Sequence, residues 1–213
     1  YTPLHSAAGS GHLGQIPPAV LLAADLAQKT HLGQTIFHEA AEHGALDRMP
    51  AGLISLERLL DKNISGETVF HVAALNGHLN QLPPELLTEE AMLQTTNAGD
   101  TPVHSAAISG HLGQIPPGLL NARTLTVASK SGFTPIHAAA ETGQLDKIPA
   151  AVLTVELLLT RNDNGDTPLH AAAFEGHLDQ VPATLLTAET IETRNYEGLT
   201  VSRIAVDRKF SHQ

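Results

Sequence analysis

Thirteen histidines are the side chains of this 213-residue chain with the most evident capacity for chemistry. Imidazole binds zinc and serves as a general acid or base near neutral pH. Most of these histidines, however, recur at multiples of 33 residues and so occupy two repeated positions. The first position holds His5, His38, His71, His104, His137 and His170, and the second holds His12, His78, His111 and His177. His31, His43 and His212 lie outside both series.

The repeated spacing argues against a metal site. Zinc needs three or four ligands that converge on one point. Histidines of one series would instead be spaced along a stack, about 10 Å apart if the repeats pack like neighbouring helices. The sequence also lacks the nucleophile-elbow, phosphate-loop, HExxH and dinucleotide-binding motifs, and its Ser, His and Asp residues fall in repeated positions. We therefore expect no metal, no cofactor, no catalytic residue and no enzymatic activity.

The elements that position the histidines form a unit of 33 residues. Six units open with Thr, Pro or a β-branched residue, an apolar residue and His, and continue with x-Ala-Ala and a glycine. The seventh begins at Thr200 and has lost the His. We predict a single array over residues 1–213, with units starting at 2, 35, 68, 101, 134 and 167 and a partial unit at 200–213.

Local chemistry predicts one short helix at the start of each unit. Thr is a good N-cap, and Pro fits the first helical position because its missing N–H has no helical partner there. The paired Ala residues have high helix propensity and little bulk, so neighbouring units can approach closely. The glycine, as at Gly44 or Gly143, stands where a helix ends in a left-handed residue. Turn residues such as Asn162-Asp163-Asn164-Gly165 precede each Thr and predict projecting loops or β-hairpins.

The pattern N-x-x-G-D-T-P-L-H-A-A-A-x-x-G-H-L resembles the ankyrin repeat, whose hallmark is T-P-L-H-x-A-A at a period of 33. The resemblance covers essentially the whole chain. It implies an all-α fold, an α-solenoid with short hairpin or turn connections. It also implies that the first histidine series hydrogen-bonds to backbone and Thr groups and ties adjacent units together.

Prolines depart from the family pattern in the second half of each unit. They stand at Pro17, Pro50, Pro83, Pro116, Pro149 and Pro182, doubled by Pro18, Pro84 and Pro117. The residue before a proline is pushed out of the α region. We read the rest of each unit as a short proline-led helix followed by another helical turn, capped by Ser55, Thr88, Thr154 or Thr187. The alternative is one continuous helix with an exposed threonine in its middle.

Positions that vary between units are free to bind a partner. The resemblance implies that a partner lies on the concave face, against the hairpin tips and the exposed face of the first helix. The large apolar residues at these positions are Leu75, Ile108, Phe133, Phe174, Tyr196 and Leu199. Of these, Phe174, Tyr196 and Leu199 fall near one another in adjacent units. Each residue either anchors a partner or packs against a neighbouring hairpin.

Charge and composition narrow the partners. The net charge of −10 argues against nucleic acid and against an anionic membrane surface. No apolar run is long enough to span a bilayer. The absence of cysteine excludes disulfides and suits a reducing compartment, so a cytoplasmic location is favoured. We expect a protein-interaction module or scaffold. The alternative is a structural subunit that self-assembles head-to-tail through its solenoid ends.

Overall fold

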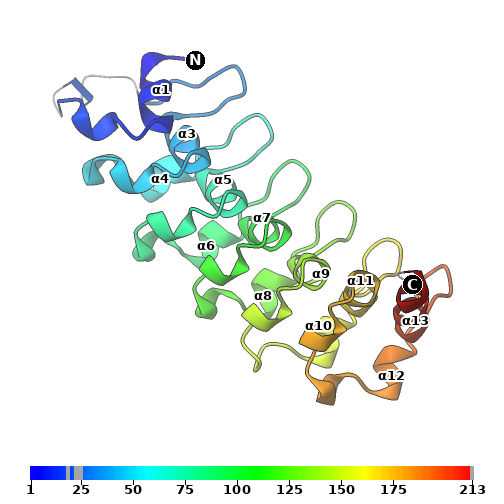
Figure 1. The fold of residues 1–213 in the computed structure, drawn as a ribbon. Coiled ribbons are helices and arrows are strands. Elements are labelled where there is room, and N and C mark those ends of the chain that lie inside the picture. The colour runs from blue at the N-terminus through cyan, green and yellow to red at the C-terminus, as the bar shows by residue number, and fades with distance from the viewer. Residues whose placement is uncertain (18–19, 22–25, 212–213) are drawn as a thin grey trace. The chain divides into compact units, whose positions relative to one another are not determined.

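The computed structural model describes residues 1–17, 20–21 and 26–211 (Figure 1). These residues form helices, turns and loops, with no strand among them. One isolated bridge joins Arg194 and Thr200. The all-α class predicted from the sequence is therefore confirmed. Contacts divide the chain into two compact units, Tyr1–Ala106 and Ala107–Gln213. The prediction of a single array over residues 1–213 stays a prediction, and Pro18 and His212 lie outside the described residues.

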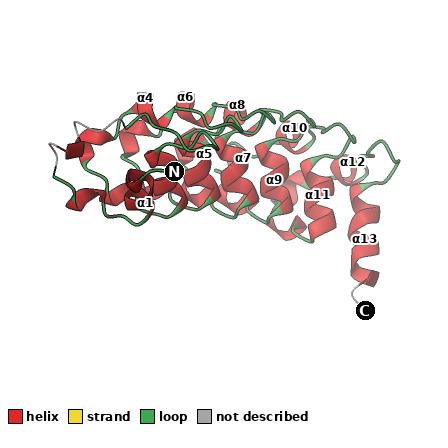
Figure 2. Cartoon of the chain, turned by 90° about the horizontal axis from the view of Figure 1, so that it is seen from above, coloured by secondary structure: helices red, strands yellow, loops and turns green. Residues whose placement is uncertain are grey.

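The first unit stacks its longer helices side by side, with α1 against α3 and α3 against α5. Short helical turns make a second layer beside them (Figure 2). The α-helices are α1 (Pro3–Gly9), α3 (Ile36–Glu42), α4 (Leu56–Leu59), α5 (Val69–Leu75) and α6 (Glu89–Met92). The 3₁₀ turns are η1 (Leu13–Gln15), η2 (Leu46–Arg48), η3 (Ala51–Leu53), η4 (Leu79–Gln81) and η5 (Pro84–Leu86).

The second unit repeats this plan, and the division between the units falls within α7 (Pro102–Ile108). Here α11 packs against both α9 and α13. The α-helices are α8 (Ala122–Leu125), α9 (Pro135–Glu141), α10 (Val155–Leu158), α11 (Pro168–Glu175), α12 (Ala188–Ile191) and α13 (Val201–Ser211). The 3₁₀ turns are η6 (Leu112–Gln114), η7 (Pro117–Leu119), η8 (Leu145–Lys147), η9 (Leu178–Gln180) and η10 (Ala183–Leu185).

The first helix of each repeat begins and ends where the sequence predicts. Helix α9 starts after the extended N-cap Thr134, with Pro135 in the first helical position. Its end is followed by Gly143, whose φ of 68° lies in the left-handed region. The paired alanines of α9, Ala139 and Ala140, are fully buried, so their small side chains let adjacent helices approach closely. The loops before each Thr are turns and not paired hairpin strands in the described residues.

The proline interrupts the second layer, as the sequence predicts. Leu82, just before Pro83, is extended at φ −84° and ψ 146°, because a proline crowds the α region of the preceding residue. The continuous-helix alternative is therefore wrong. The helical turn predicted after the proline-led segment is also confirmed. The Thr88 hydroxyl accepts a hydrogen bond from the N–H of Ala91 and caps the start of α6.

One detail of the proline-led segment needs correction. In four repeats it is a single 3₁₀ turn, as at Pro84–Leu86, and not a short α-helix. In the repeat that contains Pro149 it is only a turn. After Pro17, by contrast, the described residues Val20 and Leu21 are α-helical, as predicted. A further 3₁₀ turn, such as Leu79–Gln81, precedes the proline and was not predicted. In the described part of the chain, no helix combines the length and apolar character that crossing a membrane requires.

Candidate functional site

The first histidine series is structural, as predicted. In His71, the ring Nδ1 accepts the backbone N–H of Thr68 at 3.0 Å and lies 2.8 Å from the Thr68 hydroxyl. A ring nitrogen that accepts an N–H carries no proton, so the proton is on Nε2. That nitrogen donates to the carbonyl of Asp100, 29 residues further on, at 3.1 Å. The same link joins His5 to Gln34, His38 to Glu67, His137 to Asp166 and His170 to Leu199.

Burial and these contacts make His38, His71 and His170 less basic and leave no ring nitrogen of theirs free to bind a metal. Burial lowers the pKa of His71 to about 4, and burial also lowers the pKa of His38 and His170. Both ring nitrogens of each are occupied by hydrogen bonds within the fold. The series is a ladder of hydrogen bonds that ties α1, α3, α5, α9 and α11 each to the loop of the next repeat.

A second set of polar side chains joins neighbouring repeats at and just beyond the C-terminal end of the first helix. His78 Nδ1 lies 2.7 Å from the carbonyl oxygen of Ala41 in the preceding repeat. Gln81 accepts the N–H of Leu46 and donates to the carbonyl of Gly44. Gln180 makes the equivalent two bonds in the second unit. These glutamine contacts were not predicted, although glutamine recurs in the sequence at the repeat-related positions Gln15, Gln81, Gln114 and Gln180.

One histidine outside the two series lies near carboxylates. His43, Glu39 and Glu42 each offer one ligand atom, and these atoms lie within 4.8 Å of one another. Two of the groups are already engaged, because Tyr1 donates its hydroxyl to Glu39 at 2.9 Å and His43 Nδ1 lies 3.0 Å from the Glu39 carbonyl. Nothing else in the described residues marks this trio as a metal site.

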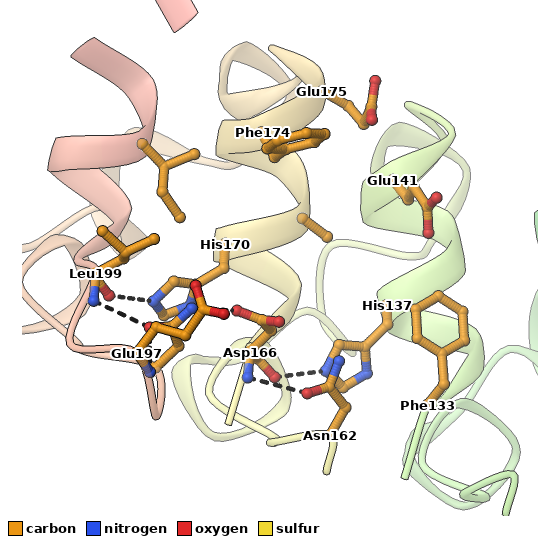
Figure 3. Close-up of a pocket in the computed structure, with 13 residues that line it drawn as sticks. Phe133, His137, Glu141, Asn162, Asp166, His170, Phe174, Glu175, Glu197 and Leu199 are labelled. Atoms are coloured by element: carbon orange, nitrogen blue, oxygen red, sulfur yellow. Dashed lines mark hydrogen bonds between the residues drawn. The ribbon is translucent and has the colours of Figure 1, made fainter. Parts of the chain in front are cut away.

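The most distinctive surface feature lies in the second unit. A pocket of about 350 Å³ opens between α9, α11, α13 and the loops that precede α11 and α13 (Figure 3). We call it the α11 pocket. Its lining residues are Phe133, His137, Glu141, Asn162, Asp166, His170, Ala171, Phe174, Glu175, Asn195, Glu197, Leu199 and Ile204. Its volume is at the lower end of the range for small-ligand pockets, so it fits one or two side chains.

Aromatic and aliphatic side chains form one part of the α11 pocket. The Phe174 side chain is 64% exposed and Leu199 is 38% exposed. The Phe133 ring packs against the His137 ring with a centroid distance of 5.4 Å. His137 and His170 also line the pocket, and hydrogen bonds to backbone carbonyls hold their rings in place.

Carboxylates form the other part. Figure 3 shows Glu141 and Glu175 near the helix ends and Asp166 and Glu197 on the loop side. Asp166 accepts a hydrogen bond from the Asn195 amide at 2.7 Å. Glu175 lies 3.7 Å from Arg208. The carboxylates of Glu141 and Glu197 have no hydrogen-bond or ion-pair partner among the described residues.

The structure brings together three of the six residues that the sequence analysis gives as candidates for partner binding. Phe133, Phe174 and Leu199 all line the α11 pocket. Tyr196, expected beside Phe174 and Leu199, is outside it. Its ring packs over the adjacent loop, where a Cβ on Gly165 would lie 2.6 Å from it, and it remains 73% exposed. Leu75 and Ile108 are exposed on α5 and α7 and are not among the lining residues.

Ile204 is a lining residue that the sequence analysis missed. It lies one period of 33 after Ala171, so the same face of α13 carries it. The repeat alignment could have found it, but the final helix had lost the histidine that marks the register.

The described residues form stacks of repeated helical units, which defines a helical repeat protein. Residues 117–195 match the family model for ankyrin repeats, in three copies. No curated protein matches the sequence. The fold is similar to two solved structures. The human ASB11 ankyrin repeat domain has a TM-score of 0.68 and 22% identity, with 96% of this chain and 92% of that chain covered. The ankyrin repeat domain of Bcl-3, a member of the IkappaB family, has a TM-score of 0.64 and 20% identity, with 98% of each chain covered.

These findings confirm the resemblance predicted from the sequence. Residues 117–195 are ankyrin repeats, and the chain has the fold of an ankyrin repeat domain. Ankyrin repeat domains generally mediate protein–protein interaction. The partner of this chain and the surface that binds it are matters of proposal.

Proposed function

We propose that this chain is a non-catalytic interaction module that holds a segment of a protein partner in the α11 pocket. One observation carries the proposal: Phe174 and Leu199 are exposed apolar side chains at the edge of a preformed hollow. Exposed apolar side chains that surround a pocket are typical anchors of protein interfaces.

The origin of the lining residues supports the proposal. Phe133, Asp166 and Leu199 occupy one repeat position, the residue after the turn glycine, and Glu141 and Phe174 occupy another near the end of the first helix. Both positions vary between repeats, whereas the Thr and His positions of the scaffold recur. A repeat protein changes its specificity at such variable positions while the scaffold stays constant.

The chemistry of the pocket supports a binding role over a catalytic one. A general base needs a ring nitrogen or carboxylate that can reach a substrate proton. The lining histidines His137 and His170 instead use both ring nitrogens within the scaffold. Replacing His137 or His170 would therefore disturb the fold before it disturbed any reaction.

Affinity capture with mass spectrometry tests this proposal. The wild-type chain is compared with the double variant Phe174→Ala/Leu199→Ala and with Tyr196→Ala, whose ring lies outside the pocket. We expect the double variant to keep its circular dichroism spectrum and to lose the captured partner. Tyr196→Ala should retain the partner. Equal recovery by the double variant would count against the proposal.

The alternative of head-to-tail self-assembly has no specific observation in its favour among the described residues. It predicts a particle mass that rises with protein concentration in light scattering. A constant monomer mass, together with loss of the partner in the double variant, would leave partner binding as the function.

A further inference from the structure

The α11 pocket is lined by acidic residues, and none of its described lining residues is a lysine or an arginine. The four carboxylates belong to Glu141, Asp166, Glu175 and Glu197. Arg208 lies near Glu175, and Asn195 hydrogen-bonds to Asp166. The carboxylates of Glu141 and Glu197 have no hydrogen-bond or ion-pair partner among the described residues. Both residues are exposed, so a ligand can reach them.

Two carboxylates stand where a helix alone would disfavour them. Glu141 is the last residue of α9 and Glu175 is the last residue of α11. The C-terminal end of a helix carries partial negative charge from its unpaired carbonyls, and acidic side chains there are unfavourable. Arg208, at 3.7 Å, offsets the charge of Glu175. Helix stability does not explain Glu141, whose carboxylate would attract a cation in the pocket.

The histidines in the lining do not offset this negative charge. Nδ1 of both His137 and His170 lies within hydrogen-bonding reach of the N–H and hydroxyl of a threonine. Nε2 of each donates to a carbonyl of the next loop. These bonds fit the neutral ring, and burial lowers the pKa of His170. The pocket therefore presents carboxylates and aromatic rings, while both lining histidines are engaged within the scaffold.

The aromatic rings in the pocket determine whether a guanidinium or an ammonium group fits better. Phe174 offers an exposed ring, and Phe133 lies half-buried across the hollow (Figure 3). A guanidinium group stacks on an aromatic ring and can bind a carboxylate through two parallel hydrogen bonds. An ammonium group is compact and strongly hydrated, and it does not stack in this way. An arginine side chain thus complements both parts of the pocket.

We infer that the α11 pocket binds an arginine side chain from a positively charged segment of a protein partner. This inference rests on the proposed function and specifies the partner's chemistry. The net charge of −10 would also steer a basic segment toward the chain.

The test uses fluorescein-labelled synthetic peptides and fluorescence anisotropy with the full chain. One peptide alternates arginine with glycine and serine. Two matched peptides carry lysine or glutamate in place of arginine. The pocket variant is Glu141→Gln/Glu197→Gln, which keeps the shape and removes two charges. The control variant is Glu90→Gln/Glu189→Gln, which makes the same charge change at two exposed positions outside the pocket.

We expect the arginine peptide to bind the wild-type chain, and to bind the pocket variant at least about tenfold more weakly, because charge-assisted hydrogen bonds are lost. The control variant should stay within about twofold of the wild type, since its two charges do not line the pocket and are screened by solvent. A Phe174→Leu variant should also weaken binding of the arginine peptide, because leucine keeps the apolar bulk but lacks a π face.

Several results would overturn the inference: no binding of the arginine peptide, equal binding of the lysine or glutamate peptide, or equal weakening by the two charge variants. Failure here is separable from failure of the proposed function. If Phe174→Ala/Leu199→Ala loses the captured partner but Glu141→Gln/Glu197→Gln retains it, the pocket binds a protein and the basic occupant is excluded.

Discussion

The Nε2 atom of His170 donates a hydrogen bond to the backbone carbonyl of Leu199 at 3.2 Å. This contact joins the scaffold to the α11 pocket, because the same Leu199 presents its side chain to the pocket. The ladder that holds the repeats together therefore also fixes the position of a residue that we propose contacts the partner.

Replacing His170 with alanine should destabilise the fold. The variant leaves the buried N–H of Thr167 and the part-buried carbonyl of Leu199 without their partner. Unpaired buried polar groups cost about 1–3 kcal/mol each. We expect the free energy of unfolding in urea to fall by about 2 kcal/mol or more. His31→Ala, at an exposed position outside both histidine series, is the control and should change it by less than about 0.5 kcal/mol. Similar losses in the two variants would contradict the ladder's role.

Acid should destabilise the fold through the same ladder. Burial lowers the pKa of His71 from the ordinary value of 6.5 to about 4. The unfolded chain therefore binds this proton at a higher pH than the folded chain does. The contribution of His71 to the free energy of unfolding is fully present above pH 6.5 and is lost as the pH falls toward about 4. That difference in pKa corresponds to roughly 3 kcal/mol for this buried group.

Thermal unfolding followed across this pH range measures the effect. The pKa values of His38 and His170 are lowered as well, so the wild-type midpoint should fall steadily below about pH 6.5. A His71→Gln variant should be less stable at neutral pH and less sensitive to acid. A midpoint that stays constant between neutral pH and pH 5 would contradict the neutral state of the ladder.

Gly165 is held by both its conformation and its surroundings. Its φ is 76°, and an added Cβ would lie 2.8 Å from the backbone nitrogen of Tyr196. Gly198 has a similar φ of 82° but open space around it, and Gly118 has neither constraint. Alanine at Gly198 should cost about 1 kcal/mol from the left-handed backbone alone. Alanine at Gly165 should cost clearly more, and alanine at Gly118 should change stability by less than about 0.5 kcal/mol. Urea unfolding of the three variants measures this order, and equal costs at Gly165 and Gly198 would contradict the close contact between loops.

Gln180 should contribute to coupling between repeats. It accepts the N–H of Leu145 and donates to the carbonyl of Gly143. We expect Gln180→Ala to lower the free energy of unfolding by about 1–2 kcal/mol, since both groups lose a partner. Gln15 occupies the same repeat position but is exposed, so Gln15→Ala is a matched control with little expected effect. Unchanged stability of Gln180→Ala would show that water replaces these bonds without cost.

Much of the fold could be predicted from the sequence because its determinants are local. Thr134, Pro135 and Gly143 mark the two ends of α9, and each acts through the conformation of its own backbone. Pro83 likewise fixes the extended conformation of Leu82. The 3₁₀ turn at Leu79–Gln81 was not predicted, because the bonds that Gln81 makes to Gly44 and Leu46 come from another repeat.

The candidate site was predicted only in part, for a related reason. The repeat period identified Phe133, Phe174 and Leu199 as variable residues on one face. It could not show that the Tyr196 ring packs over Gly165, since that depends on how adjacent loops meet. The combination of Glu141, Glu197 and these apolar residues in one pocket is likewise a property of packing between repeats.

Hydrogen–deuterium exchange on the chain bound to its captured partner tests the central claim most directly. We predict that the partner protects the loop at residues 195–199 and the end of α11 at Phe174 and Glu175, and leaves α10 and α12 unchanged. Protection confined to the second layer, at α10 and α12, would contradict binding in the α11 pocket.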